Sequence, residues 1–200
     1  MRTALILAAA ALTAACSGAE GEEQTAQVEA AAAPAAQASA PQAAAPAPAV
    51  TDPQIADIVV AANEVDIAAG ELARTRATDA EVKAFAEKMV TDHSGVNRAA
   101  SDLVGRLGVT PERSATSDQL RQGGEQSRTA LQGQSGAAFD RAYIDHEVTY
   151  HQAVLDAIDQ TLIPSATSGE LKALLQQTRP AVEAHLQHAR QIQARLGGSS

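Results

Sequence analysis

Three histidines are the residues of this chain whose positions best suit chemistry. His93, His151 and His185 each fall near the middle of a segment with helical periodicity, on that segment's apolar stripe. Such stripes face the interior when helices pack together. Asp66 has the same placement in an earlier helical segment. In a bundle of equal-length helices the midpoints lie level, so we expect these four side chains to converge in one buried layer.

The chemistry that suits such a layer is metal binding. Neutral imidazoles together with a carboxylate suit Zn, Fe, Mn or Cu, and three histidines with one further position form a recurrent site composition. We therefore predict one ion bound by His93, His151, His185 and Asp66. The acids available to orient the imidazole rings are Asp92, Glu147 and Glu183.

A metal-free polar layer is the second interpretation of the same residues, because buried polar groups can serve only to set helix register. His146 and His188 fall off their stripes, and we expect them on the surface. Tyr143 and Tyr150 share a face with His146, where we expect packing or contact with a partner. The chain has no nucleophile elbow, P-loop, HExxH or CxxC motif, and no catalytic residue is identified. A small mononuclear metalloenzyme is therefore a third, less favoured interpretation.

Four long helices must position these residues, and no segment alternates as a strand does. We predict helices at about 53–76, 78–107, 137–162 and 168–196. The connection over 109–136 is much longer than the other two, with a short helix expected at 118–131. Two helical hairpins joined by a long crossover is the wiring of ferritin-like bundles. The predicted fold is thus an all-α, ferritin-like four-helix bundle over residues 53–200.

Local signals delimit these helices. Asp52 before Pro53 is expected to cap the first helix, and Thr78 with Glu81 to form a capping box at the second. Pro164 is expected to stop the third. A faint internal repeat has an offset of 89 positions, shown by Glu81-Val82-Lys83-Ala84-Phe85 and Glu170-Leu171-Lys172-Ala173-Leu174.

The N-terminus has the pattern of an export signal. Residues 1–15 hold one basic residue and a short apolar run, and Leu12-Thr13-Ala14-Ala15-Cys16 resembles a bacterial lipobox. Cys16 is the only cysteine, so no disulfide forms within the chain. We predict a lipid attached to Cys16 and a location on the periplasmic side of a Gram-negative cell envelope. An aspartate directly after the lipidated cysteine is the usual signal for retention in the inner membrane. Ser17 stands at that position here, which favours the outer membrane.

Residues 16–52 are rich in alanine and proline and poor in branched apolar residues, so we predict a disordered tether to the membrane. The whole chain carries 15 basic and 24 acidic residues, a formal net charge of −9. This acidity argues against nucleic-acid binding. An envelope protein partner is compatible with it, and the oligomeric state is not predicted.

The helical segments carry a family resemblance. Asn63-Glu64-Val65-Asp66-Ile67, Val82-Lys83-Ala84-Phe85-Ala86, Met89-Val90-Thr91-Asp92-His93, Phe139-Asp140-Arg141-Ala142-Tyr143, His151-Gln152 and Glu183-Ala184-His185-Leu186 resemble an exported bacterial ferritin-like family. That family is a domain of unknown function, often labelled as outer membrane proteins. The resemblance covers about residues 53–196 and implies a helical bundle in the bacterial envelope, with no established activity.

The chain departs from di-iron ferritins, which place a glutamate three residues before a metal-binding histidine. Val90 and Val182 occupy those positions before His93 and His185, so ferroxidase activity is not carried over. The expected function is that of a non-enzymatic, lipid-anchored periplasmic bundle with one metal ion, in envelope stress or metal handling. The alternative is a structural or interaction lipoprotein with a metal-free polar layer.

Overall fold

The computed structural model describes residues 50–198, and every regular element in that range is helical. In chain order these elements are α1 (Asp52–Arg76), α2 (Ala80–Leu107), α3 (Ala115–Gln132), α4 (Gly136–Ala157), the π-helical turn η1 (Ile158–Leu162), α5 (Ile163–Ser165) and α6 (Gly169–Gly197). The all-α prediction is confirmed. The predicted signal segment, the lipid attachment at Cys16 and nearly all of the predicted tether lie outside the described residues. No helix within residues 50–198 combines the length and apolarity that a membrane span needs.

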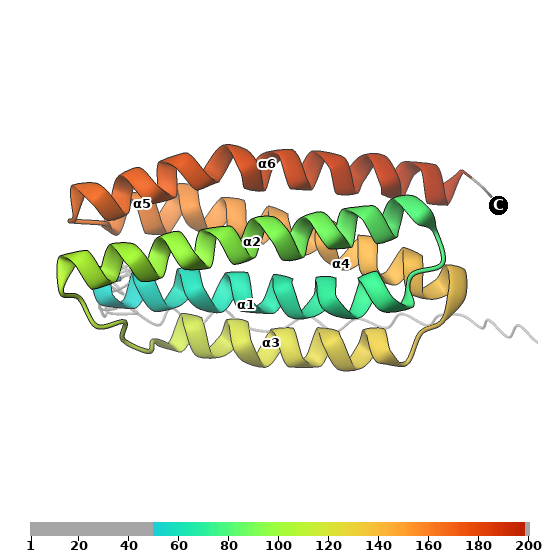
Figure 1. The fold of residues 1–200 in the computed structure, drawn as a ribbon, viewed down its shortest axis with the longest axis horizontal. Helices are drawn as coiled ribbons and strands as arrows, with labels where there is room; N and C mark the ends of the chain where they lie inside the picture. Colours follow the sequence, from blue (N-terminus) through green and yellow to red (C-terminus); the bar gives the residue numbers. More distant parts are fainter. Residues whose placement is uncertain (1–49, 199–200) are drawn as a thin grey trace, which may run out of the picture. The chain divides into compact units, whose positions relative to one another are not determined.

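Two antiparallel hairpins form the bundle (Figure 1). Helices α1 and α2 form the first hairpin, and α4 and α6 form the second. Helix α3 returns along the length of α1, so α4 runs parallel to α2. This is the predicted wiring of two hairpins and a long crossover.

The crossover is more ordered than predicted. Helix α3 spans Ala115–Gln132 and packs on α1 as a fifth long helix. Gly124 allows the close approach, because a Cβ atom there would lie 2.5 Å from a methyl carbon of Val65. Periodicity underestimated this helix because its sequence offers few apolar residues, and only Ser117 and Leu131 are buried.

Two capping predictions are wrong by one residue. Thr51 rather than Asp52 caps α1, and its side chain accepts the Gln54 amide hydrogen. Asp79 rather than Thr78 caps α2. In both cases the residue that we expected to cap its own helix takes part in a longer-range contact.

Those contacts are reciprocal between the two hairpins. Asp140 on α4 accepts hydrogen bonds from the Thr78 amide (2.9 Å), the Thr78 hydroxyl (2.5 Å) and the Asp79 amide (3.0 Å). At the other end of the bundle, Asp52 on α1 accepts the same three kinds of bond from Thr167 and Ser168. Thr78-Asp79 and Thr167-Ser168 stand 89 positions apart, the offset of the predicted repeat. Each hairpin therefore holds the turn of the other with one carboxylate.

The π-helical turn interrupts the predicted third helix. The Ile163 amide donates to the Ile158 carbonyl, five residues earlier. Pro164 follows directly; it has no amide hydrogen and its ring crowds the carbonyl four residues back. A wider turn relieves this crowding, so the chain stays helical to Ser165 instead of stopping at the proline.

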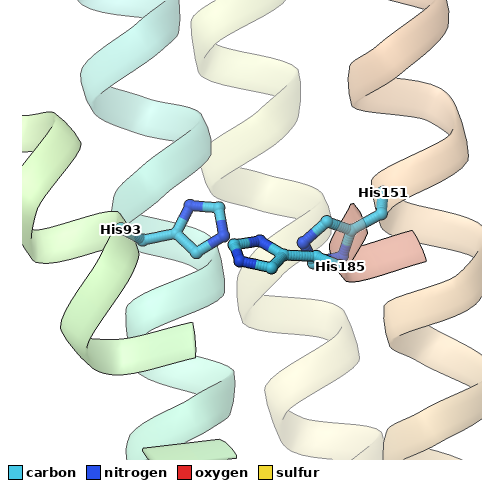
Figure 2. Close-up of side chains that lie close together, drawn as sticks. All are labelled: His93, His151 and His185. Atoms are coloured by element: carbon cyan, nitrogen blue, oxygen red, sulfur yellow. The ribbon is translucent and has the colours of Figure 1, made fainter. Parts of the chain in front are cut away.

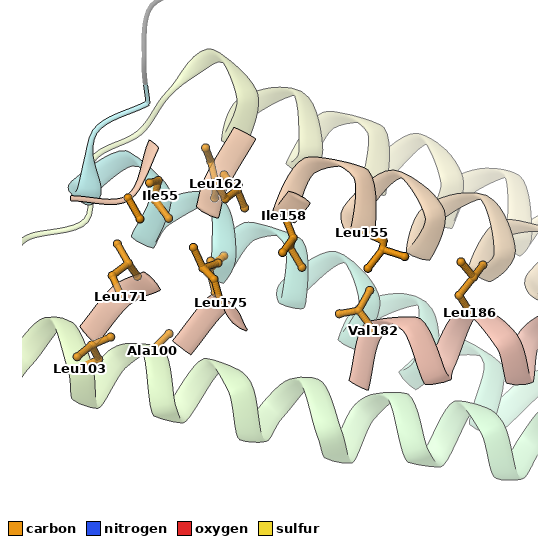
Figure 3. Packing of buried hydrophobic residues seen from close by; sticks show 13 residues of the cluster. Ile55, Ala100, Leu103, Leu155, Ile158, Leu162, Leu171, Leu175, Val182 and Leu186 are labelled. Carbon is orange, nitrogen blue, oxygen red and sulfur yellow. The ribbon is translucent and has the colours of Figure 1, made fainter. Parts of the chain in front are cut away.

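The apolar core consists of two clusters, one toward each end of the bundle. The first includes Ile55, Leu103, Ile158, Leu175 and Val182 (Figure 3). The second includes Phe85, Met89, Phe139, Tyr143 and Ile192. Along α1, α2 and α4 the boundary between the clusters falls at buried polar residues, namely Asp66, His93, Glu147 and His151.

Candidate metal centre

Each of the four bundle helices contributes one predicted site residue to the polar layer. Asp66 comes from α1, His93 from α2, His151 from α4 and His185 from α6, and all four are buried. The three imidazole rings face one another in the interior (Figure 2). Their centroids are 5.3 Å apart for His93 and His185, and 5.5 Å apart for the other two pairs. The convergence expected from helix phase is therefore present.

The outer nitrogen of His93 is held by an amide side chain. His93 Nδ1 lies 2.7 Å from Asn63 Oδ1. The Asn63 amide group donates in turn to the Val59 carbonyl, at 2.7 Å, which leaves its oxygen facing the histidine. Since an amide oxygen only accepts, His93 Nδ1 carries the hydrogen and Nε2 keeps its lone pair. Sequence reasoning placed Asn63 at the edge of the stripe and missed this role.

The other two rings are oriented in the same manner. His151 Nδ1 lies 3.0 Å from the Glu147 carbonyl oxygen, and 3.2 Å from the carboxylate of the same residue. His185 Nε2 lies 2.9 Å from Asp92 Oδ2, which also accepts from Lys88 Nζ at 2.6 Å. Both outer partners are acceptors, so the hydrogens reside on these outer nitrogens. Outward hydrogen bonds of this kind fix the tautomer and orientation of metal-binding histidines.

The inner nitrogens have no hydrogen-bond partner within the described residues. These atoms are His93 Nε2, His151 Nε2 and His185 Nδ1, and each is buried. They lie within 4.8 Å of one another. Oδ2 of Asp66 is 3.2 Å from His93 Nε2 and 3.4 Å from His151 Nε2, without hydrogen-bond geometry. Three lone pairs and a carboxylate oxygen thus meet at one buried place. Because buried polar atoms normally have partners, this arrangement suits a bound cation.

The ring spacing matches that of a three-histidine metal site. A zinc–nitrogen bond of about 2.0–2.1 Å places each ring centre roughly 3.2 Å from the ion. Two such rings at a tetrahedral angle have centres about 5.2 Å apart, and at a trigonal angle about 5.5 Å apart. The observed separations of 5.3 to 5.5 Å fall between these two values.

Burial keeps two of the rings neutral, which is the form that binds metal. It lowers the pKa of His93 to about 3, helped by the charges of the neighbouring His151 and His185. It also lowers the pKa of His185 to about 4, although the hydrogen bond to Asp92 opposes the shift. Neither ring carries a proton on its inner nitrogen at neutral pH.

A second group of potential metal ligands shares His151 with the first and includes two acids. Asp66, Glu147 and His151 offer ligand atoms within 4.8 Å of one another. Burial raises the pKa of Asp66 well above its ordinary value, and the charge of Glu147 adds to the rise. Burial likewise raises the pKa of Glu147 to about 8. These carboxyl groups therefore favour a proton in the absence of a cation, and a cation nearby would favour their ionised form.

The three acids predicted to orient the rings have different surroundings. Asp92 contacts His185, although it comes from α2 rather than α6. Glu147 is fully buried against His151. Glu183 lies in an ion pair with Arg179, at 3.0 Å, on the partly exposed side of α6. The acid at His185 could not be chosen by sequence distance, because it lies on another helix.

The predicted surface face of α4 is partly covered. His146 is half-buried, and burial lowers its pKa to about 4. Tyr143 is fully buried in the second core cluster, and the Tyr150 hydroxyl donates to the Ala62 carbonyl at 2.8 Å. The expectation of a surface histidine here is wrong, because α3 packs over α1 and α4 and covers this side of the bundle. His188 remains partly exposed beside Phe85.

Comparison with known proteins provides a family. No curated protein matches the chain, and no solved structure matches it. One family model, described as Domain of unknown function (DUF4142), matches residues 34–192, which include all four residues of the candidate centre. The chain belongs to this DUF4142 family.

Proposed function

We propose that this protein binds one metal ion through His93, His151 and His185, with Asp66 as a fourth ligand. The observation that carries the proposal is the orientation of the three rings. Each has its outer nitrogen hydrogen-bonded to an acceptor and its inner nitrogen buried without a partner. Donors of this composition suit Zn, Fe, Mn or Cu.

The bound ion would supply the positive charge that the buried layer lacks. It would accept the three inner lone pairs and stabilise ionised Asp66, whose pKa burial otherwise raises. Asn63, Asp92 and the Glu147 carbonyl would keep the rings aimed at it. Folding and metal binding would then be coupled, because the ligands come from four helices.

We further propose that the bundle is a non-enzymatic, lipid-anchored periplasmic protein that handles metal in the cell envelope or serves under envelope stress. The export signal pattern and the lipobox-like segment ending at Cys16 support this placement. An envelope protein partner fits the same role. Mass spectrometry of the N-terminal peptide tests the anchor: a lipid adduct on Cys16 is expected, and a free thiol would refute it.

Elemental analysis tests the metal site directly. The protein is purified without a His-tag or chelator, then incubated with Zn, Fe, Mn and Cu salts in turn. We expect close to one ion per chain, and loss of that ion in the His93→Ala/His151→Ala/His185→Ala variant. His188→Ala is the matched control, because His188 lies on the same helix as His185 but outside the layer.

A metal-free polar layer is the competing function. It predicts no stoichiometric metal under any of these conditions and an unchanged profile in the triple variant. In that case the inner nitrogens would act only in packing and helix register. Their lack of partners favours the metal site, because an unsatisfied buried polar atom costs free energy.

A further inference from the structure

An apolar cavity of about 300 Å³ adjoins the candidate metal centre. Asp66, His93 and His151 lie on its wall, and the rest of the lining is mostly aliphatic. Ile158, Leu175 and Val182, which also line it, appear among the core residues of Figure 3. The cavity therefore connects the polar layer with the interior of the first core cluster.

The lining also shows where the cavity opens. Thr116 on α3, Ala153 on α4 and Thr161 on η1 belong to the lining and are themselves exposed. The mouth accordingly lies where the crossover helix faces α4 and its π-helical turn. π-helical turns within helices are frequent at functional sites, and Ile158, Thr161 and Leu162 of this one line the cavity.

Size and lining restrict what could fill the space. An apolar cavity of about 150 Å³ is enough to bind benzene. Twice that volume suits a ligand of roughly ten non-hydrogen atoms. An aliphatic body would contact Ile58, Val59, Val154 and Leu174, whereas the imidazole and carboxyl groups of the lining belong to the metal centre.

We propose that this cavity binds a medium-chain aliphatic monocarboxylate, with its chain among the aliphatic side chains and its carboxylate at the metal ion. The inference rests on the proposed function for the head group only. His93, His151, His185 and Asp66 would supply four donors to the ion, and the ligand's carboxylate would supply a fifth donor, an oxygen, from the cavity side. The chain is held by the cavity itself, independently of the ion.

Calorimetric titration with octanoate tests the proposal on the full-length protein after its metal content has been measured. Metal-loaded protein is expected to bind one octanoate, about a hundredfold more tightly than butyrate, because octanoate buries four further methylene groups. Equal affinity for the two acids, or no binding of octanoate, would overturn the proposal.

Ala157→Phe fills the cavity from the α4 side. It should weaken octanoate binding at least about tenfold, as the added ring occupies the space of the chain. The metal content should stay as in the wild type. Ala194→Phe, on the exposed face of α6, is the matched control and should bind octanoate normally. Unchanged octanoate affinity in Ala157→Phe would place the acid elsewhere and refute the assignment.

A neutral ligand distinguishes failure of the metal site from failure of the cavity as a binding site. If the wild type takes up no metal, chelator-treated protein is titrated with 1-octanol, which has the chain without the charge. Binding that Ala157→Phe abolishes would retain the cavity as an aliphatic-chain site and refute only the metal. Absence of octanol binding would refute the cavity as well.

Discussion

Asp140→Ala should destabilise the whole bundle although Asp140 lies far along α4 from the histidines. Asp140 is 2% exposed, and its carboxylate accepts three hydrogen bonds from Thr78 and Asp79, at the turn between α1 and α2. A hydrogen bond to a charged group contributes about 1.5–3 kcal/mol. The three bonds share one acceptor and are not additive, so we expect the free energy of unfolding to fall by about 3–4 kcal/mol.

Urea unfolding followed by far-UV circular dichroism measures this loss. Asp140→Asn keeps one acceptor oxygen and should lose about half as much. Asp52→Ala removes the equivalent bonds at the other end, but Asp52 is more exposed and water can replace it, so about 1 kcal/mol is expected. The metal content should be unchanged in all three variants. A loss below about 0.5 kcal/mol in Asp140→Ala would show that the hydrogen bonds of Asp140 to the turn between α1 and α2 do not stabilise the bundle.

Three further variants test the packing and the electrostatics. Gly124→Ala should destabilise the protein, since its Cβ would lie 2.5 Å from a Val65 methyl carbon. Gly123→Ala is the control: a Cβ there meets nothing within 4 Å, so it should stabilise the helix by about 0.5–1 kcal/mol. Thermal unfolding measures both. Arg121→Ala should lower the free energy of unfolding by about 1–3 kcal/mol at pH 7, because it breaks a paired contact with Asp57; the difference from wild type should shrink in acid, since Arg121 lowers the pKa of Asp57. In metal-free protein, raising the pH from 6.5 to 8 should reduce stability, and Glu147→Gln should diminish that reduction by about 1–2 kcal/mol.

The sign of the last effect follows from the raised pKa of Glu147. The folded protein holds the proton up to about pH 8, while the unfolded chain releases it near the ordinary value of 4.5. Stability from this group is therefore complete below the unfolded pKa and is lost as the pH rises through the folded one. His93 and His185 act in the opposite sense mainly below their ordinary pKa of 6.5. Between pH 6.5 and 8 the loss of stability therefore comes from the buried carboxyl groups of Glu147 and Asp66, and Glu147→Gln removes the contribution of Glu147. A Glu147→Gln variant with the pH dependence of wild type would contradict this account.

Much of the fold was predictable because it depends on local periodicity. The apolar stripes place the long helices, and the lengths of the connections indicate two hairpins and a crossover. Helix phase also placed His93, His151 and His185 on buried faces. Helix α3 was underestimated because its contact with α1 depends on the absence of a side chain at Gly124, and a missing atom leaves no apolar signal.

The sequence by itself determined the helices, the faces that they bury and the level of the histidines, because a helix repeats its geometry every 3.6 residues. Tertiary structure alone decided which nitrogen of each ring points inward, since that depends on partners from other positions such as Asn63 and Asp92. It also decided that Asp66 is buried, with Glu147 close by, so that its pKa is raised, and that a cavity remains beside it. These features arise from distances between helices, and residue spacing along one helix carries no information about such distances.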